Sequence, residues 1–138
     1  MSNLVRLSLS IEKPLLDRLE KMVQGGGYTN RSEFVRDMIR DLLVRQEWKR
    51  GEEVVGTINL IYNHHVRQLS EKLTHTQHHH HKSIMATTHI HLDEELCAET
   101  IMVRGKASEI KELADDLRKQ KGVLHANLSA SSTGKLLK

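Results

Sequence analysis

The segment IMATTHIHLDEELCAETIMVR, residues 84–104, does most to decide the fold, because it has the pattern of two strands joined by a charged turn. In its first half β-branched and apolar residues alternate with His89 and His91. At a period of two, both imidazoles emerge on one face of a strand, about 6.5–7 Å apart. Two imidazoles can close that gap onto one ion, since metal–nitrogen bonds are about 2 Å long. The segment therefore predicts a β-hairpin that carries a preformed pair of metal ligands.

Cys97 begins the second strand of this hairpin and is the only cysteine of the chain. A single cysteine allows no intrachain disulfide and fits a reducing compartment, where a lone thiolate can serve as a ligand. A buried structural cysteine is the more frequent role, but the His-x-His pair just upstream favours a ligand. With His78 added, three nitrogen donors and one sulfur donor suit a single transition-metal ion.

Further elements flank the hairpin on both sides. We expect strands at residues 54–62, 84–92, 97–104 and 122–128, with helices at residues 64–77 and 107–121. The order βαββαβ predicts a ferredoxin-like domain over residues 54–129. The mostly polar stretch from Glu47 to Glu53 is expected to be a linker, and residues 130–138 a mobile tail.

Composition limits the class of protein. The chain has 138 residues, enough for one ordinary domain or two small ones, but only 3% aromatic and 38% apolar residues. So little core material predicts an obligate oligomer. The chain has no long uninterrupted apolar run and no signal-peptide pattern, so we expect a soluble, cytoplasmic protein without membrane contact. The formal charge of +3 is carried entirely by residues 1–50, which is weak evidence for a nucleic-acid partner because many basic segments are solvated faces.

Residues 4–11 alternate strictly between apolar and polar side chains, with Val5, Leu7, Leu9 and Ile11 on one face. This pattern predicts one short amphipathic strand. An isolated strand cannot satisfy the hydrogen bonds of its edges, and a second copy of the chain could supply the partner. A dimer joined by a two-stranded ribbon is therefore expected.

Two helices are expected after this strand. Pro14 suits the first turn of a helix, and Gly25–Gly27 ends it. Asn30 or Ser32 can cap a second helix, whose apolar stripe lies within residues 34–43. The first 47 residues thus have the order strand, helix, turn, helix.

That order, the motif Arg6-x-Ser8-x-Ser10, the glycine turn and the run at residues 28–37 resemble a ribbon-helix-helix DNA-binding domain. In that family the paired strands of two chains enter the major groove, which a two-stranded ribbon fits. The resemblance implies base contacts from Arg6, Ser8 and Ser10. The chain departs from the family by serine at two positions where threonine is common, which removes a methyl group that could meet thymine.

The resemblance also implies phosphate contacts from Asn30 and Arg31 at the start of the second helix. Free backbone N–H groups and the helix dipole favour phosphate there. Alternation alone would fit an ordinary solvated strand face. The glycine turn and the Asn-Arg-Ser helix start, in the right order, favour the DNA-binding interpretation.

Nearly the whole chain resembles the nickel-responsive transcription regulators. The specific part is TQHHHH at residues 76–81, followed by the His-Ile-His pair, Cys97 and Glu99. The resemblance implies one Ni²⁺ per subunit, bound by His89, His91 and Cys97 of one subunit and by His78 of a neighbour.

It also implies a homotetramer, a dimer of dimers, built by the second domain, which is ACT-like. Tyr62 and Glu99 match family residues beside the metal, where hydrogen bonds orient the ligands. The remaining histidines of the tetrad, His79–His81, are expected to be exposed or secondary metal contacts. An ordinary surface or hydrogen-bonded role is expected for His64, His65, His75 and His125.

A second cation site is a weaker expectation. Glu33, Asp37 and Asp41 recur at helical spacing, and like charges so placed repel modestly. By default, the positive charges of Arg36 and Arg40 on the adjacent face of the helix are expected to offset this repulsion. In the family, however, residues that match Glu33 and Asp37 can hold a hard cation where the two domains meet on DNA.

The function implied by the family is metal-dependent binding of operator DNA, with repression of metal-uptake genes and no catalytic residue. The donors alone do not identify the metal, because three imidazoles and a thiolate suit Zn(II), Ni(II) or Cu(II). A metalloenzyme using Glu99 as its base, or a metal-storage or delivery protein, would also explain the histidines. Neither explains the N-terminal ribbon, and a fourth ligand at His78 closes the open position that a catalyst needs.

Overall fold

The computed structural model describes residues 3–138, and the chain divides into two compact units at Arg40 and Asp41. The first unit contains helix α1, Lys13–Gly25, and the start of helix α2, Arg31–Arg50. The expected glycine turn ends α1: Gly27 adopts a left-handed conformation (φ 72°), and the Tyr28 N–H donates to the Val23 carbonyl at 3.1 Å. The expected cap of α2 is Asn30, whose side-chain oxygen accepts the Glu33 N–H at 3.0 Å.

The segment before α1 differs from the sequence-based expectation. Residues 3–12 form no regular strand, and the apolar side chains Leu4, Val5, Leu7 and Leu9 are between 72% and 87% exposed. A strand needs a neighbour to bond its backbone, and a single chain offers none at this place. The alternation is present, but the strand that it predicts requires a second copy.

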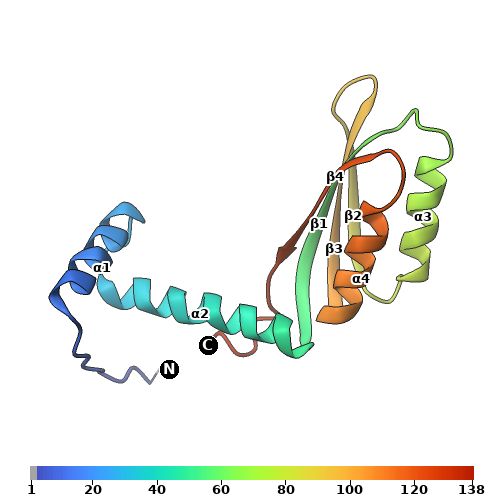
Figure 1. Cartoon of the computed structure of the whole chain (residues 1–138). Coiled ribbons are helices and arrows are strands. Elements are labelled where there is room, and N and C mark those ends of the chain that lie inside the picture. The colour runs from blue at the N-terminus through green and yellow to red at the C-terminus, as the bar shows by residue number, and fades with distance from the viewer. Residues whose placement is uncertain (1–2) are drawn as a thin grey trace. The chain divides into compact units, whose positions relative to one another are not determined.

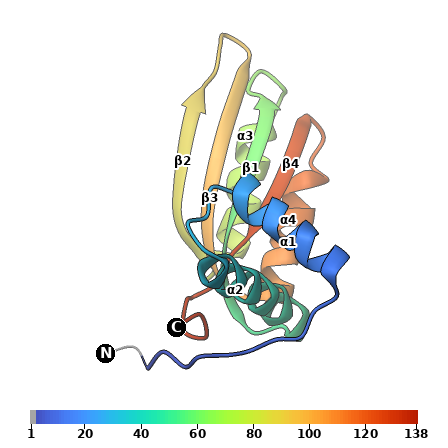
Figure 2. The same ribbon diagram turned by 90° about the vertical axis from the view of Figure 1, so that its left-hand side faces the viewer.

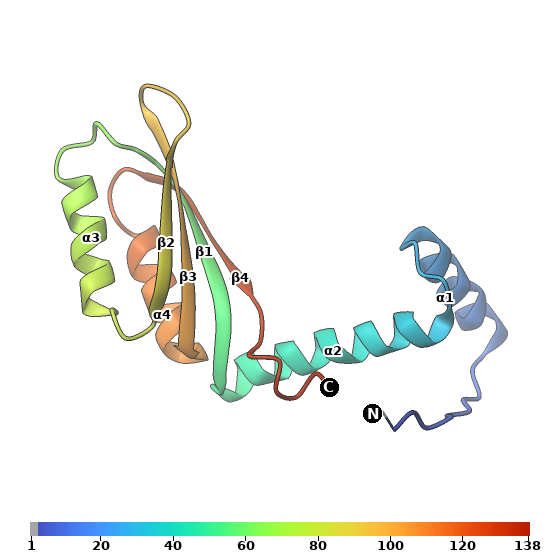
Figure 3. The same cartoon turned by 180° about the vertical axis from the view of Figure 1, so that it is seen from behind.

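The second unit is one four-stranded antiparallel sheet with helices on one face (Figures 1 and 3). Its elements are β1 (Glu53–Asn63), α3 (Leu69–His79), β2 (Ile84–His91), β3 (Leu96–Lys106), α4 (Ala107–Arg118) and β4 (Val123–Ala130). The strand order is β2-β3-β1-β4, which Figure 2 shows face on. The predicted ferredoxin-like, ACT-like arrangement is confirmed.

The core of this unit lies between the sheet and the two helices. Alternate residues of β1 and β3 face the helices and are buried, among them Ile58, Leu60 and Ile101. Helix α4 contributes the apolar stripe expected for it, including Leu113 and Leu117, both fully buried. The other face of the sheet carries exposed apolar side chains, among them Ile90 and Met102.

The two largest differences from the expected boundaries are at the start of α3 and at the end of α2. Helix α3 begins at Leu69 rather than at residue 64, because the backbone of the preceding residues bonds elsewhere: the His64 N–H donates to the Glu95 carbonyl at 3.0 Å, and the His65 N–H to the Asn63 side chain at 2.8 Å. Residues 64–68 are therefore a loop held against the β2–β3 turn.

The second difference is at the expected linker. Helix α2 continues to Arg50, and the buried Trp48 packs against Gly56 and donates its indole N–H to the Ser131 carbonyl at 2.7 Å. Burial of one large aromatic ring outweighs the polar residues around it. Ser131 in turn donates its N–H to Val55 at 2.8 Å, so the segment after β4 is fixed at its start. Within residues 3–138 no helix is both long and apolar enough to span a bilayer.

Candidate metal centre

The register of the sheet aligns the predicted ligands. Cys97 on β3 lies opposite His91 on β2 and opposite Tyr62 on β1. In the next row on the same face, Glu99 lies opposite His89. Because directly paired residues of antiparallel strands point to the same face, the sheet brings all five side chains to one end of its helix-covered side.

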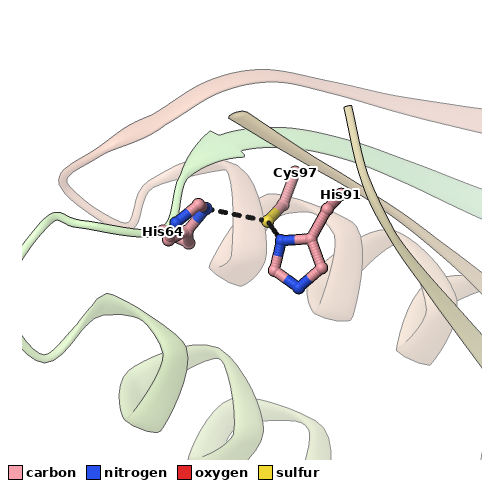
Figure 4. Close-up of side chains that lie close together, drawn as sticks. All are labelled: His64, His91 and Cys97. Carbon is pink, nitrogen blue, oxygen red and sulfur yellow. Dashed lines mark hydrogen bonds between the residues drawn. The ribbon is translucent and has the colours of Figure 1, made fainter. Parts of the chain in front are cut away.

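Three donor atoms converge at this place. The Cys97 Sγ lies 3.3 Å from the His91 Nδ1 and 3.2 Å from the His64 Nδ1 (Figure 4). All three donor atoms lie within 4.8 Å of one another. Two of them belong to predicted ligands, whereas His64 was expected to be an ordinary surface histidine. In the part of the chain described, this is the one group of three or more such side chains close enough to hold an ion.

His64 reaches the site because of where β1 ends. It lies two residues beyond Tyr62, and its N–H bonds to Glu95 in the β2–β3 turn. Asp93 shapes that turn by accepting the N–H groups of Glu95 and Leu96 at 2.8 and 2.7 Å. The pairing of Tyr62 with Cys97 would have revealed His64, but this register is not visible in the sequence.

The other two predicted ligands lie apart from this group. The His89 ring is beside the site, with its centroid 5.0 Å from that of His91 and 6.0 Å from that of Tyr62. His78 is exposed in the last turn of α3 and is not part of the group described above. Within one chain, therefore, the structure assembles His91 and Cys97, keeps His89 adjacent, and leaves His78 free to meet something else.

Burial changes the pKa values of the two kinds of donor in opposite directions: it leaves the His64 imidazole ready to bind a cation, but it keeps the proton on the Cys97 thiol. Burial, and after it the negative charges of Asp93 and Glu99, raises the pKa of the Cys97 thiol. Removal from water, followed by the neighbouring histidines, lowers the pKa of His64. The imidazole of His64 is thus neutral near pH 7 with a lone pair to donate, and the thiol keeps its proton until a cation displaces it.

A hydrogen-bonded chain behind the site connects it to α3. The Tyr62 hydroxyl donates to Glu99, and burial together with the charge of Glu99 raises the pKa of Tyr62 to about 12. Gln77 donates to the Glu99 carboxylate at 3.0 Å and accepts from Thr87 at 3.4 Å. Since Gln77 immediately precedes His78, this chain fixes the helix turn that carries the fourth predicted ligand.

The donor set fits a late transition metal. With metal–nitrogen bonds of about 2.0–2.1 Å and metal–sulfur bonds of about 2.3 Å, ligand atoms around one ion are roughly 3–3.7 Å apart. The two sulfur–nitrogen separations at Cys97 fall in that range. Imidazole and thiolate favour Ni, Cu or Zn over the hard cations Mg²⁺ and Ca²⁺.

The first unit carries the residues predicted to contact DNA. Arg6, Ser8 and Ser10 are exposed in the irregular segment before α1. Asn30 is used as the cap of α2, and the adjacent Arg31 forms an ion pair with Glu20. A phosphate group would have to compete with that carboxylate for Arg31.

The residues predicted for a second cation site have protein partners in the single chain. Glu33 accepts a hydrogen bond from Thr29 at 3.0 Å. Asp37 accepts one from Tyr28 at 2.9 Å and pairs with Arg40 at 3.0 Å. The ion pair of Asp37 with Arg40 is the default arrangement that the sequence suggested for offsetting the repulsion among the carboxylates. A cation bound at Glu33 and Asp37 stays a prediction.

Comparison with known proteins agrees with both halves of this description. Residues 5–46 match the family described as ribbon-helix-helix protein, copG family, and residues 55–131 match the NikR C terminal nickel binding domain. The chain also resembles the solved structure of an uncharacterized protein from Thermotoga maritima, with a TM-score of 0.53 and 12% identity over 57% of this chain and 98% of that one. This last likeness concerns the fold alone.

Relatives match over the full length. A protein of Geobacter metallireducens named "Putative nickel-responsive regulator" is 49% identical over 99% of both chains. Proteins of the same name from Solibacter usitatus and Dictyoglomus turgidum are 47% and 48% identical, over 100% of both chains and over 94% of this chain and 96% of the other. The ribbon-helix-helix unit, the nickel-binding domain and this identity along the whole chain show that the protein belongs to the family of nickel-responsive regulators.

Proposed function

We propose that the chain is a cytoplasmic, nickel-dependent repressor of metal-uptake genes, active as a homotetramer that binds one Ni²⁺ per subunit. In this proposal His89, His91 and Cys97 of one subunit and His78 of a neighbour hold the ion. The observation that carries it is the convergence of His91 and Cys97 at the open edge of the sheet. Strand β2 has a neighbour on one side only and His91 is exposed, so a donor from another chain has access.

Assembly through the second unit is supported by apolar side chains on the sheet face away from the helices. Ile90 lies opposite Ala98 on this face, and Met102 is two positions from Thr100 on the same strand. Ile90 and Met102 are 54% and 46% exposed. Covering such a face with a second copy removes apolar surface from water, at about 25 cal/mol per Å².

DNA binding is supported by the first unit. If the segments before α1 of two chains pair, their apolar side chains can pack together and onto the helices. The polar face with Arg6, Ser8 and Ser10 then faces outward, where a two-stranded ribbon can enter the major groove. In this proposal Arg31, at the start of α2, leaves its ion pair with Glu20 and binds phosphate.

The coupling between metal and DNA is a shift of population. The bound ion supplies a cross-link between chains rather than a reacting centre. Cys97 gives up its proton on binding, and His78 becomes tied to the hairpin of another subunit. Gln77 and Glu99 transmit that restraint to the last turn of α3, which favours the arrangement in which both ribbons can dock. Two ribbons held in one assembly gain effective concentration for two half-sites.

The test is a titration of DNA from upstream of the protein's own gene, followed by fluorescence anisotropy at fixed salt. We expect saturating Ni²⁺ to strengthen binding relative to chelator, and His78→Ala to lose most of that gain. His79→Ala, one residue further along the same exposed helix end, is the matched control and should respond like the wild type. Equal affinity with Ni²⁺ and with chelator would overturn the proposal, because a ligand that does not discriminate between conformations cannot shift them.

A further inference from the structure

We propose that His64, His91 and Cys97 form an intrachain capture site, which takes up the metal ion on one subunit before His78 of a neighbour and His89 replace His64. This inference rests on the proposed function, since it describes how the intersubunit site is filled. It assigns a metal-binding role to a histidine that sequence analysis had treated as ordinary.

The first support is that the capture site is complete in a single chain. Its three donor atoms come from β3, β2 and the loop after β1, and they already lie within 4.8 Å of one another. An ion can therefore be bound without any movement of backbone. The intersubunit site, by contrast, needs His78 from another chain and a new position of the His89 ring.

The second support is the tether of His64. Its backbone N–H is bonded to the Glu95 carbonyl, so the imidazole is held over the Cys97 sulfur rather than left in solvent. Its neighbour His65 has the same ring but a different partner, because its Nε2 donates to the Glu94 carbonyl at 2.9 Å. The chain thus places one of two adjacent histidines at the metal site and uses the other to hold the turn.

The third support is that His64 can leave. It is half-buried in a loop, and its backbone is joined to the hairpin by the hydrogen bond from its N–H to the Glu95 carbonyl. His91 and Cys97, on two paired strands, are held by the sheet. Loss of the His64 ligand therefore disturbs little else, whereas the strand residues stay bound throughout the exchange.

The exchange balances without a redox step. On capture the Cys97 thiol releases one proton to solvent, and two neutral imidazoles donate lone pairs. On transfer His64 departs as a neutral imidazole, while His89 and His78 of the neighbour donate theirs. Two ligands replace one, so the ion moves toward the intersubunit site.

The experiment follows thiolate-to-metal charge-transfer absorption after rapid mixing of the full-length protein with aqueous Ni²⁺. His64→Ala should slow the appearance of the band by about ten- to hundredfold, as expected for loss of a metal contact. His75→Ala, which removes an exposed histidine of α3 outside this group, is the matched control and should keep the wild-type rate. His64→Gln, which preserves volume and polarity, should be as slow as His64→Ala, and thermal unfolding of each variant checks the fold.

The equilibrium arm uses His78→Ala. This variant should still develop a band that depends on Cys97, and the double variant His64→Ala/His78→Ala should lose most of it. A wild-type rate in His64→Ala, or an equal band in the single and double variants, would overturn the capture site. A different result would contradict the proposed function and leave the capture site standing. In that result, His78→Ala keeps the full Ni²⁺-dependent gain in DNA affinity, while His64→Ala still slows the appearance of the band.

Discussion

Two segments of the chain have an alternating pattern and different outcomes. Residues 4–11 alternate between apolar and polar side chains throughout, and the segment of residues 84–91 alternates around His89 and His91. The later segment is strand β2, because β3 follows it and bonds to it. The earlier segment pairs with no strand among residues 3–138 and remains irregular, with its apolar residues in water. An alternating pattern gives a strand only where a partner strand is available. The predicted metal ligands His91 and Cys97 therefore come together within one chain, whereas the strand predicted to contact DNA needs a second chain.

The largest expected effect tests the hairpin of β2 and β3, which forms within one chain. Cys97→Ala should remove the charge-transfer band and lower the affinity for Ni²⁺ by about a hundredfold or more, because the thiolate joins both histidines. Absorption titration measures both quantities. Thr100→Ala, on the opposite face of the same strand, should bind as the wild type does. An unchanged band in Cys97→Ala would remove the thiol from the site.

In the wild type the same titration should depend on pH. The pKa of Cys97 is raised, so a proton competes with the metal around neutrality. Affinity should fall by about tenfold for each pH unit below the pKa of that thiol, with one proton released per ion bound. Affinity that is independent of pH in this range would contradict binding by a buried thiolate.

The next effect tests residues 4–11, whose predicted strand needs a second chain. Leu7→Asp places a charge on the apolar face that two ribbons must share, at a position now 74% exposed. Burying a leucine contributes about 1.5–3 kcal/mol, and each ribbon pair loses two. DNA affinity should therefore fall by at least about a hundredfold in anisotropy, while the Ni²⁺ band persists. Ser8→Ala, on the other face, should have a much smaller effect.

Smaller effects separate the two kinds of DNA contact. Arg6→Ala should cost about 1–3 kcal/mol of discrimination at one base pair of each half-site. Arg31→Ala should weaken binding to every sequence alike and reduce the slope of affinity against salt concentration. Competition with mutated half-sites at several salt concentrations measures both. If Arg6→Ala instead weakened binding to every sequence equally, Arg6 would be a phosphate contact rather than a base contact.

The smallest effect concerns the turn that closes the hairpin. Two backbone N–H groups lower the pKa of Asp93, so its contribution to stability is present above its unfolded-state value and is lost as pH falls through its folded-state value. Asp93→Ala should lower the melting temperature slightly at pH 7 and not at about pH 2, below the ordinary range of this carboxyl. Circular dichroism follows the transition. Glu94→Ala is the control, and an equal loss at both pH values would contradict this origin.

The order of elements was predictable because alternation and helical periodicity are local properties. They located both helices and all four strands of the second unit within a few residues. What remained hidden depends on distant partners. His64 was missed because its importance arises from the pairing of Tyr62 with Cys97, 35 positions away along the chain, which only the register reveals. Trp48 was missed because its place in the core depends on Gly56 and Ser131.

Trp48 is the chain's single tryptophan, and it lies buried with its indole N–H bonded to a carbonyl. Its fluorescence emission therefore has one source, which belongs to the second unit. A red shift of that emission on heating will report exposure of this core to water without any label. Loss of helix seen by circular dichroism before the shift would be assigned to the first unit. One cuvette can thus follow the melting of the two units separately.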